Sequence, residues 1–381
     1  MTSIGIIAEY NPFHNGHLYQ IKKIKEKYPD SIIVLVMSGN FTQRGDVAII
    51  DKWKRCQAAL NNNCDLIIEL PFSFSCASAD YFAYGAIKLL EELKVQKLVF
   101  GSESDDITTL DTVASCQINN DEFEKLVKIY SKFGYNYPTA LSKAVLDLTG
   151  KKIDDPNDLL GISYIKTIKE NNYKIQPEII KRTNSYHDLD LNNEISSASA
   201  IREGLKNNIN ITNQIPENTH KYYGDLHFID DYYPYIKYKI ITSKDLSIYQ
   251  DVDEGLDKKL KKEIVNCNSF SELVESIKTK RYTYNKICRM LIHILCSYTK
   301  ELNKKFNDIK YIRILGLNKK GQEYLNRIKK DISLPIISKI TREKDKMLEY
   351  EIETTKIYAL PSSNYLDLVN KEFEKIIKED Q

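Results

Sequence analysis

The sequence predicts an α/β protein: a Rossmann-like domain with a parallel sheet, then a helical middle region and a small C-terminal α/β module. Three observations support this fold class. Short apolar runs alternate with helical patterns in the first 100 residues, residues 256–304 have helical periodicity, and residues 311–340 have the pattern strand, helix, strand. The expected domains are residues 1–225, 226–305 and 306–381.

The first four strands are predicted from continuous apolar runs, which are typical of parallel strands buried on both faces. These runs are residues 3–8, 31–37, 65–70 and 97–100. Helical patterns separate them at residues 16–27, 51–62 and 79–93. The resulting order, β-α-β-α-β-α-β, predicts a doubly wound sheet.

A helical block precedes the last strand of this domain. Residues 106–171 have helical periodicity, with Pro138 and Pro156 near expected helix starts, and a strand candidate follows at 175–182. We therefore expect a helical insertion at about 106–171. An aromatic and acidic stretch at 222–235 leads into the helical middle region.

Composition narrows the class of protein. The chain has 381 residues, 42% of them hydrophobic, and no apolar run approaches the roughly 18 residues of a membrane span. The opening residues lack the features of a signal peptide, so we expect a cytoplasmic location and no membrane partner. The seven cysteines include no C-x-x-C pair, which argues against a disulfide framework or a zinc knuckle.

The junction between the first strand and the first helix carries the strongest chemical signal. The stretch contains the pattern H-x-G-H, with His14, Gly16 and His17. The carboxyl end of a parallel strand followed by a helix N-terminus is where α/β sheets bind anionic ligands, and free N–H groups there favour phosphate. Gly16 would let the backbone approach a phosphate, and both histidines could donate to phosphate oxygens. A zinc pair is an alternative, but no third ligand is evident nearby.

A second signal is I-S-S-A-S-A-I-R at residues 195–202. Hydroxyls at a helix start are usually caps. Its position after the last strand of the first domain suggests instead a second phosphate loop, with Ser197, Ser199 and Arg202 facing the nucleotide and Arg202 on the first turn of the helix.

With these two motifs the chain resembles the nucleotidylyltransferase superfamily and, more closely, the bacterial tRNA(Met) cytidine acetate ligase family. The resemblance extends over nearly the whole chain. It includes M-S-G-N-F-T-Q-R-G at 37–45, I-E-L-P-F, F-G-S-E-S at 100–104, P-N-D-L-L-G-I-S-Y at 156–164, Arg182 before Tyr186, His187 and Asp188, and K-T-K-R-Y-T at 278–283. One departure is Gln20, where the family often has a histidine.

The resemblance implies an enzyme that adenylates acetate with ATP and transfers the acetyl group to N4 of the wobble cytidine of elongator tRNA(Met). It implies catalytic roles for His14 and His17, and Mg²⁺ is expected on the departing pyrophosphate. The implied ATP contacts are Ile7, Ala8, Glu9, Tyr10, Asn11, Pro12, Phe13, His14, Asn15, Gly16, His17, Leu18, Tyr19, Gln20, Gly101, Asn157 and Arg182.

Three of these ATP contacts also have ordinary structural interpretations. Gly101 could simply end a strand, Asn157 could be a cap or turn residue, and Arg182 could pair with Asp188 or another surface acid rather than with phosphate. The loop 38–41 and residues 78–80 either shape an acetate pocket or are ordinary loop and cap residues.

For the tRNA, the net charge of +2 means that binding must depend on a local patch. Residues 277–289 contain no acid and two tyrosines, Tyr282 and Tyr284, which could stack on unpaired bases. The cations of this stretch are Lys278, Lys280, Arg281, Lys286 and Arg289. A second cluster, Lys258, Lys259, Lys261 and Lys262, is flanked by acids and is interpreted as a solvated face.

Two other functions compete with the ligase. A small-molecule adenylyltransferase would explain the first domain but leaves the basic stretch unused. A non-catalytic RNA-binding protein would leave both histidines without a role. The sequence does not predict an oligomeric state.

Overall fold

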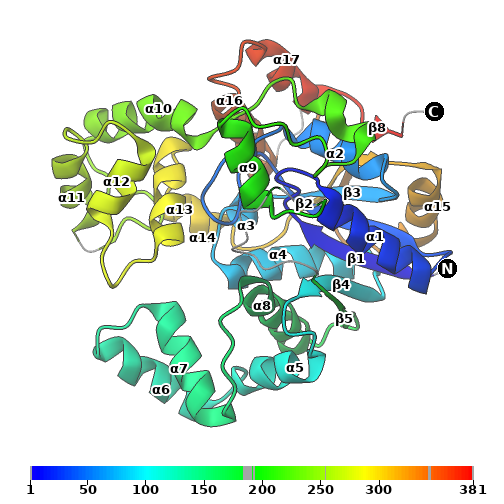
Figure 1. Ribbon diagram of the computed structural model, residues 1–381, viewed down its shortest axis with the longest axis horizontal. Helices are drawn as coiled ribbons and strands as arrows, with labels where there is room; N and C mark the ends of the chain where they lie inside the picture. Colours follow the sequence, from blue (N-terminus) through cyan, green and yellow to red (C-terminus); the bar gives the residue numbers. More distant parts are fainter. Residues whose placement is uncertain (1, 183–190, 192–193, 254, 342–344, 380–381) are drawn as a thin grey trace.

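A mixed sheet lies at the centre of the molecule (Figure 1). The computed structural model describes residues 2–182, 191, 194–253, 255–341 and 345–379. Five neighbouring strands are parallel, in the order β5-β4-β1-β2-β3. Their bounds are β1 (Ser3–Ala8), β2 (Ile32–Ser38), β3 (Leu66–Leu70), β4 (Lys97–Ser102) and β5 (Gln176–Lys181). The predicted parallel sheet is confirmed.

Helices cover both faces of this sheet, which is why its strands are continuously apolar. Alternate residues of the fully buried strand β2 enter different cores. Ile33, Leu35 and Met37 pack with α1 (Asn15–Lys27) and α2 (Lys52–Leu60) on one face. The intervening residues face α4 (Ala79–Glu92) and α8 (Pro156–Glu170) on the other (Figure 1). A short helix, α3 (Phe72–Ser75), which was not predicted, precedes α4.

The predicted helical insertion is present. It consists of α5 (Ile107–Cys116), α6 (Asp121–Lys132), α7 (Tyr137–Thr149) and α8. Pro138 lies in the first turn of α7 and Pro156 begins α8, where a missing N–H costs nothing. The α6–α7 pair extends away from the sheet, whereas α5 and α8 pack beside it (Figure 1).

The middle of the chain is helical, as expected, but contains one α-helix and one 3-10 helix that the pattern did not predict. The helices are α9 (Ala198–Lys206), the 3-10 helix η1 (Glu217–Tyr222), α10 (Ile229–Thr242), α11 (Leu256–Glu263), α12 (Phe270–Ile277), α13 (Tyr284–Leu295) and α14 (Lys300–Lys305). Helix α10 was missed because Pro234 lies inside it. Its buried stripe of Tyr232, Tyr233, Ile236 and Ile240 supplies the stabilising contacts.

The C-terminal segment has the predicted strand, helix and strand, but it does not form a sheet of its own. Strand β6 (Ile312–Leu317) pairs antiparallel with β3, and β7 (Ile336–Ile337) and β8 (Ile377–Lys378) pair with β6. The segment therefore extends the first domain's sheet. The predicted domain limits at 225 and 305 stay a prediction.

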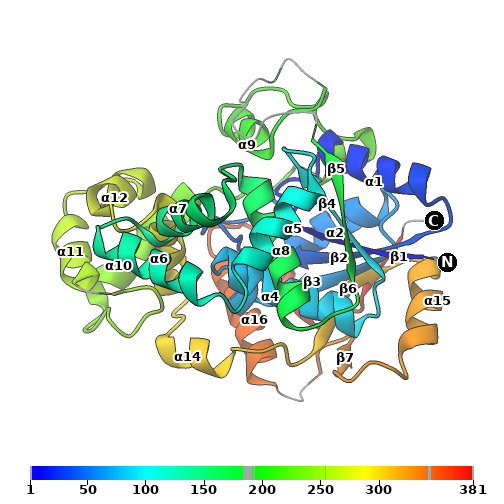
Figure 2. The ribbon, with the colours of Figure 1, turned by 90° about the horizontal axis from the view of Figure 1, so that it is seen from below.

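The remaining C-terminal helices are α15 (Lys319–Ile328), α16 (Lys346–Tyr358), α17 (Tyr365–Asn370) and the 3-10 helix η2 (Lys371–Phe373). Figure 2 shows α15 and the N-terminus at one end of the molecule and α10, α11 and α12 at the other. Within the described residues, no helix has both the length and the apolar character needed to cross a membrane.

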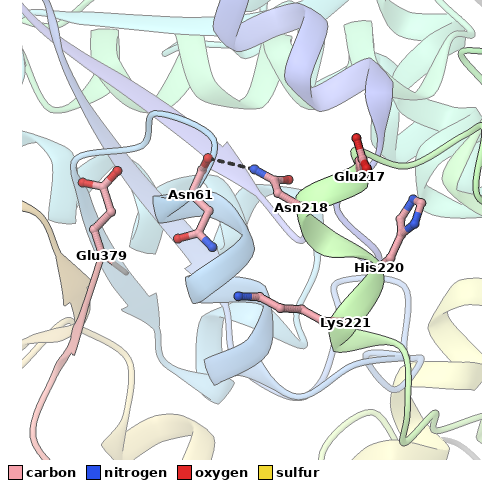
Figure 3. A pocket seen from close by; sticks show the side chains of 6 residues that line it. All are labelled: Asn61, Glu217, Asn218, His220, Lys221 and Glu379. Atoms are coloured by element: carbon pink, nitrogen blue, oxygen red, sulfur yellow. Dashed lines mark hydrogen bonds between the residues drawn. The ribbon is translucent and has the colours of Figure 1, made fainter. Parts of the chain in front are cut away.

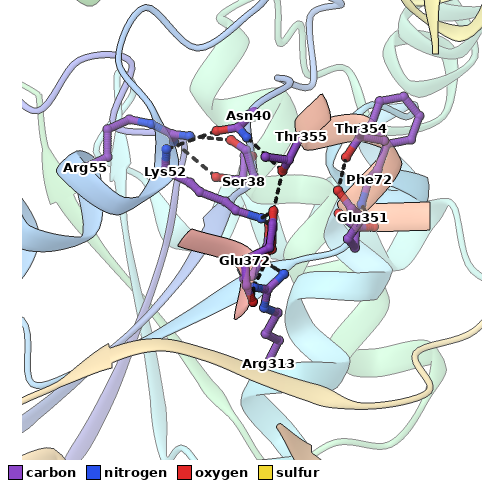
Figure 4. Close-up of polar contacts among 12 residues, drawn as sticks. Ser38, Asn40, Lys52, Arg55, Phe72, Arg313, Glu351, Thr354, Thr355 and Glu372 are labelled. Carbon is purple, nitrogen blue, oxygen red and sulfur yellow. Dashed lines mark hydrogen bonds and ion pairs between the residues drawn. The ribbon is translucent and has the colours of Figure 1, made fainter. Parts of the chain in front are cut away.

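A buried ionic network attaches this C-terminal segment to the sheet (Figure 4). Lys52 Nζ lies 2.5 Å from Glu69 Oε1 and 2.8 Å from Glu372 Oε1. Arg313 contacts the same two carboxylates, at 3.1 Å and 2.5 Å. Burial alone would raise the pKa of Glu372, but Arg313 and Lys52 lower it to about 2. Two cations and two anions thus balance inside the protein.

We expect Arg313→Met to lower the free energy of unfolding by about 3–5 kcal/mol, because it leaves Glu69 and Glu372 buried with one cation between them. Urea denaturation measures this loss. The control is Lys356→Met, which removes the exposed pair with Glu353 and should cost less than about 1 kcal/mol. Equal losses in the two variants would contradict a structural role for the network.

Candidate active site

The loop between β1 and α1 is held from several directions. The side chain of Asn11 accepts from the Ile49 N–H at 2.8 Å and donates to the Val47 carbonyl at 3.3 Å. Tyr223 Oη donates to the Phe13 carbonyl at 3.1 Å. These contacts from distant parts of the chain fix the backbone that carries the two histidines.

The two histidines form a reciprocal cap at the start of α1. His14 Nδ1 accepts the Gly16 N–H at 3.0 Å, and His17 Nδ1 accepts the His14 N–H at 3.3 Å. Their rings stack with centroids 3.8 Å apart. Because each Nδ1 is an acceptor, the proton of each neutral imidazole is on Nε2. Both rings can therefore donate one hydrogen bond from Nε2.

The surroundings keep these imidazoles neutral. Burial, with Arg182 and Arg202 nearby, lowers the pKa of His14 to about 3. Burial, His14 and Arg182 also lower the pKa of His17 well below its usual value. The same two arginines that disfavour a protonated histidine would favour a bound anion. The arrangement is therefore suited to a phosphate chain.

Gly16 has a structural role that the sequence did not suggest. A Cβ at this position would lie 2.8 Å from His14 Cε1 and 3.0 Å from His14 Nδ1. The lack of a side chain thus makes room for the His14 ring, and the expected approach of a phosphate to Gly16 stays a prediction.

The N–H groups of the first turn are also engaged, contrary to the expectation that they are free. Asn15 donates to the Gln214 carbonyl, Gly16 to His14 Nδ1 and His17 to the His14 carbonyl. In this arrangement, side-chain Nε2–H and guanidinium groups are the donors available to an anion.

The second predicted loop lies against the first. Ser197 caps α9 by accepting the Ala200 N–H at 3.0 Å, so its ordinary structural role is present. Arg202, the fifth residue of α9 rather than one of its first turn, donates to the Asn11 carbonyl at 2.7 Å and to Ser199 Oγ at 3.3 Å. The structure thus brings Arg202 and Ser199 to the histidine loop.

Gly101, Asn157 and Arg182 are also brought together, around Glu103. Arg182 Nε lies 3.4 Å from Glu103 Oε1, and the Asn157 amide donates to the same oxygen. A Cβ on Gly101 would lie 3.2 Å from Arg182 Cγ. Asp158, next to Asn157, holds this loop by accepting from Ser102 Oγ and the Glu103 and Ser104 N–H groups. The predicted pairing partner Asp188, with Tyr186 and His187, lies outside the described residues.

Several side chains of the predicted ATP stretch point into the core. Tyr10 and Phe13 are almost fully buried, and the Tyr10 ring lies 4.5 Å from that of His17. Leu18 packs against the same core, and Gln20 Nε2 donates to the Val99 carbonyl at 3.1 Å. Tyr10 and Phe13 therefore support His17 by packing beside its ring.

The loop after β2 supplies residues that sequence reasoning missed. Gln43 N–H donates to Glu9 Oε1 at 2.8 Å, and Gln43 Nε2 donates to the Ala77 carbonyl at 3.1 Å. Asp46 Oδ2 lies 4.0 Å from Arg202 Nε, and burial raises the pKa of Asp46. The only sequence signal for this loop was its family resemblance.

The proposed acetate loop at 38–41 is occupied by structural contacts. Arg55 donates to the Ser38 carbonyl at 3.1 Å and to the Gly39 carbonyl, and a Cβ on Gly39 would lie 2.9 Å from Glu69 Oε1. Asn40 accepts the Lys52 N–H and donates to Thr355 Oγ1. These contacts favour the structural interpretation of this loop.

The five predicted tRNA cations do not form one uniform patch. Lys278, Lys280 and Arg281 are exposed on the turn between α12 and α13. Lys286 Nζ lies 3.5 Å from Asp253 Oδ2, and Arg289 donates to the Gln43 carbonyl at 3.2 Å. Arg289 therefore connects α13 to the loop after β2.

A surface hollow of about 480 Å³ lies elsewhere (Figure 3). Its lining includes Asn61, Asn218, His220 and Glu379. Asn61 ends α2 and precedes β3, which places the hollow at the amino edge of the parallel strands, whereas ligands of such sheets bind at the carboxyl edge. The loop with His14 and His17, at the carboxyl edge, is therefore the better candidate for the ligand site. Among the described residues, no group of three or more His, Cys, Asp or Glu could hold a metal ion.

Comparisons with known proteins show the family to which the chain belongs. A family model described as HIGH Nucleotidyl Transferase matches residues 1–372. The chain is 40% identical over 396 residues to the tRNA(Met) cytidine acetate ligase of Caldicellulosiruptor saccharolyticus, with 98% of each chain covered. It is 41% identical to that of Clostridium novyi, with 94% of this chain and 95% of the other covered.

Two solved structures are similar over their full length. The apo crystal structure of Thermotoga maritima TmcAL aligns with a TM-score of 0.93 and 29% identity, with 100% of both chains covered. The same protein bound to alpha-thio ATP aligns with a TM-score of 0.90 and 28% identity, again over 100% of both chains.

The low pKa of His14 predicts a pH-dependent stability. Below about pH 6.5 the unfolded chain protonates this imidazole but the folded chain does not, so the free energy of unfolding should fall by up to about 1.4 kcal/mol per pH unit as pH falls to 5. His14→Gln should remove up to one proton's contribution, about 1.4 kcal/mol per pH unit, from the slope of the free energy of unfolding against pH. Urea denaturation between pH 5 and 7 measures this slope. His220→Gln is the control, and equal slopes in wild type and His14→Gln would contradict a neutral His14.

Proposed function

Because the chain belongs to the HIGH nucleotidyl transferase family and, within it, to the tRNA(Met) cytidine acetate ligases, we propose that it joins acetate to a cytidine of tRNA(Met) with ATP. The family resemblance and the fold class predicted from the sequence are confirmed. The finer assignment is transfer to N4 of the wobble cytidine of the elongator tRNA, through an acetyl-adenylate.

The observation that carries this proposal is the pair of neutral histidines beside two arginines. His14 and His17 each present an Nε2–H, and Arg182 and Arg202 lie close enough to lower the pKa of His14. Donors fixed before the substrate binds stabilise charge that develops in the transition state without reorganisation. ATP bound along this loop would place its phosphates against these four side chains.

The first step needs no covalent protein intermediate. Acetate is already an anion at neutral pH, so its oxygen attacks the α-phosphorus of ATP, and pyrophosphate leaves with the electrons of the broken P–O bond. The histidine and arginine donors stabilise the negative charge on the phosphoryl oxygens. Mg²⁺ usually binds through substrate phosphates with one or two carboxylates, and on the ATP phosphates it would neutralise the leaving pyrophosphate.

In the second step the cytosine N4 amine attacks the acetyl carbonyl, AMP leaves with the electrons of the broken C–O bond, and the N4 nitrogen gives up one proton to water. The amine is a weak nucleophile, so this step depends on the adenylate as leaving group and on placement of the base. The exposed cations Lys278, Lys280 and Arg281 would hold tRNA phosphates while the base reaches the sheet edge.

We expect His17→Ala to lower acetate-dependent ATP–pyrophosphate exchange by about 10²- to 10³-fold, the loss typical for one transition-state donor. Exchange is measured without tRNA, with a panel of short carboxylic acids for comparison. His220→Ala, at the opposite edge of the sheet, should retain wild-type exchange. A folded His17→Ala variant within about threefold of wild type would contradict the assigned role.

The panel also tests the activity itself. Exchange with a metabolite other than acetate would indicate a small-molecule adenylyltransferase, and no exchange with any acid would indicate a non-catalytic protein.

Removing two phosphate contacts should separate the two half-reactions. Lys280→Ala with Arg281→Ala should leave pyrophosphate exchange nearly unchanged, weaken tRNA binding, and flatten the plot of log K against log salt by about one to two units. The matched control is Lys258→Ala with Lys262→Ala, which removes the same charge from exposed positions of α11. An unchanged salt slope with normal acetylation would exclude this turn as the tRNA site.

A further inference from the structure

A second segment of the chain has the same chemical character as the predicted tRNA patch. Residues 125–146 contain no Asp or Glu. They contain four lysines, Lys125, Lys128, Lys132 and Lys143, and four aromatic residues, Tyr130, Phe133, Tyr135 and Tyr137. This segment spans most of α6, the following turn and most of α7.

Its aromatic rings are exposed at the tip of the α6–α7 pair. Phe133 is 75% exposed, Tyr137 58% and Tyr135 42%. The Lys143 ammonium lies 4.8 Å from the centroid of the Tyr135 ring, so a cation accompanies the aromatic surface. Three large aromatic side chains exposed within five residues are unusual for a surface that faces only water.

The fold places this tip beside the basic turn, which is residues 278–281 between α12 and α13. Asn136, between Tyr135 and Tyr137, donates from Nδ2 to the Lys280 carbonyl at 3.4 Å, across 144 positions of sequence. Figures 1 and 2 both show the α6–α7 pair at the same end of the molecule as α11 and α12. Two acid-free segments rich in cations and aromatics thus meet at one surface.

The Tyr137 side of the tip faces the elements that lead to the histidine loop. Although 58% of Tyr137 is exposed, partial burial and the nearby Asp80 carboxylate in the first turn of α4 raise the pKa of its hydroxyl. Just before that turn, the Ala77 carbonyl accepts from Gln43, which also donates to Glu9 at the end of β1. Tyr137 is therefore at the boundary between the basic turn and the candidate active site.

We propose that the tip formed by Phe133, Tyr135 and Tyr137 is a base-stacking surface that binds the unpaired nucleotides of an RNA loop, with the phosphates held by the adjacent turn at 278–281. This inference rests on the proposed tRNA substrate and identifies where its single-stranded loop binds. Stacking on aromatic rings together with cations on the backbone is how proteins hold unpaired nucleotides.

Charge complementarity favours RNA as the occupant. Two acids near the tip have partners: Asp147 accepts from Tyr130, and Asp80 lies 3.5 Å from Lys166. Lys278 lies 3.3 Å from Glu275, so the phosphate contacts proposed for the turn are those of Lys280 and Arg281. The surface therefore presents aromatic faces and cations, which suit a polyanion with exposed bases.

The test uses the full-length protein and the anticodon stem-loop of elongator tRNA(Met), titrated at several salt concentrations. Phe133→Ala with Tyr137→Ala should weaken binding by about 5- to 100-fold with no change in the salt slope, because stacking releases no counterions. Lys280→Ala with Arg281→Ala should instead flatten the slope. Binding of a fully paired duplex of the same stem should not change in the aromatic variant.

Single substitutions test the stacking itself. Tyr137→Phe should bind the stem-loop as wild type does, whereas Tyr137→Leu, which keeps apolar area without a ring, should be as weak as Tyr137→Ala. Tyr238→Ala, which removes a tyrosine of α10 that is 69% exposed, is the matched control and should have no effect. Unchanged stem-loop affinity, or an equal loss for Tyr137→Phe, would overturn the proposal.

The outcome can be separated from that of the proposed function. Acetate-dependent pyrophosphate exchange is measured without RNA in wild type and in Tyr137→Ala, and both should be equal. If wild type shows no exchange but the aromatic variants still lose stem-loop binding, the ligase activity is contradicted and the stacking surface stands. If exchange is normal and binding does not depend on the rings, only the stacking surface is contradicted.

Discussion

The buried guanidinium of Arg55 is the interaction on which the active edge of the sheet depends. The ends of β1 and β2 turn into loops inside the protein, where their carbonyl groups cannot reach water and need donors. Arg55 donates to the carbonyls of Glu9, Ser38, Gly39 and Ile50. One side chain therefore fixes the exits of two neighbouring strands. An unpaired carbonyl at any of these positions would cost about 1–3 kcal/mol.

The same helix also organises the C-terminal part of the sheet. Lys52, one turn before Arg55, contacts Glu69 on β3 and Glu372 on η2, and Arg313 on β6 completes the network. Glu69 is in the strand whose outer edge β6 covers. The antiparallel addition of β6 and the position of the active loops are thus both anchored at the start of α2. This shared anchor explains why residues 306–381 continue the first sheet.

The sequence was sufficient for the parts of the fold that follow hydrophobic periodicity. The strands at 3–8, 31–37, 65–70 and 97–100 and their connecting helices matched the structure closely, because each is an uninterrupted apolar run or an amphipathic pattern. Hydrophobic periodicity could not place β6 in the same sheet. The pairing of β6 with β3 is supported by buried charged residues at positions 52, 69, 313 and 372, and a hydropathy pattern assigns such residues to the surface. It also missed α10, because Pro234 interrupts the local signal.

For the candidate site, the sequence predicted the location of the loop but not its internal hydrogen bonds. H-x-G-H identified the loop, but its internal hydrogen bonds reverse part of the expected chemistry: Gly16 accommodates a histidine ring and its N–H binds His14. Such reciprocal capping depends on ring orientation, which residue type alone does not specify. Likewise, Asn157 and Arg182 meet at Glu103, which no spacing rule would have connected to them.

The loop after β2 connects the proposed nucleotide site to the proposed RNA surface. Gly45 has a φ of +77° and packs so closely on α13 that a Cβ would lie 2.2 Å from the Arg289 nitrogen. Arg289 donates back to the Gln43 carbonyl, and Gln43 in turn bonds Glu9 at the end of β1. Since a side chain at Gly45 would push α13 and its preceding basic turn away from the sheet, the distance between the two surfaces is set at this glycine. In the proposed mechanism an acetyl group activated at the histidines must reach a cytidine held beside the turn at 278–281, so the second half-reaction would depend on this spacing.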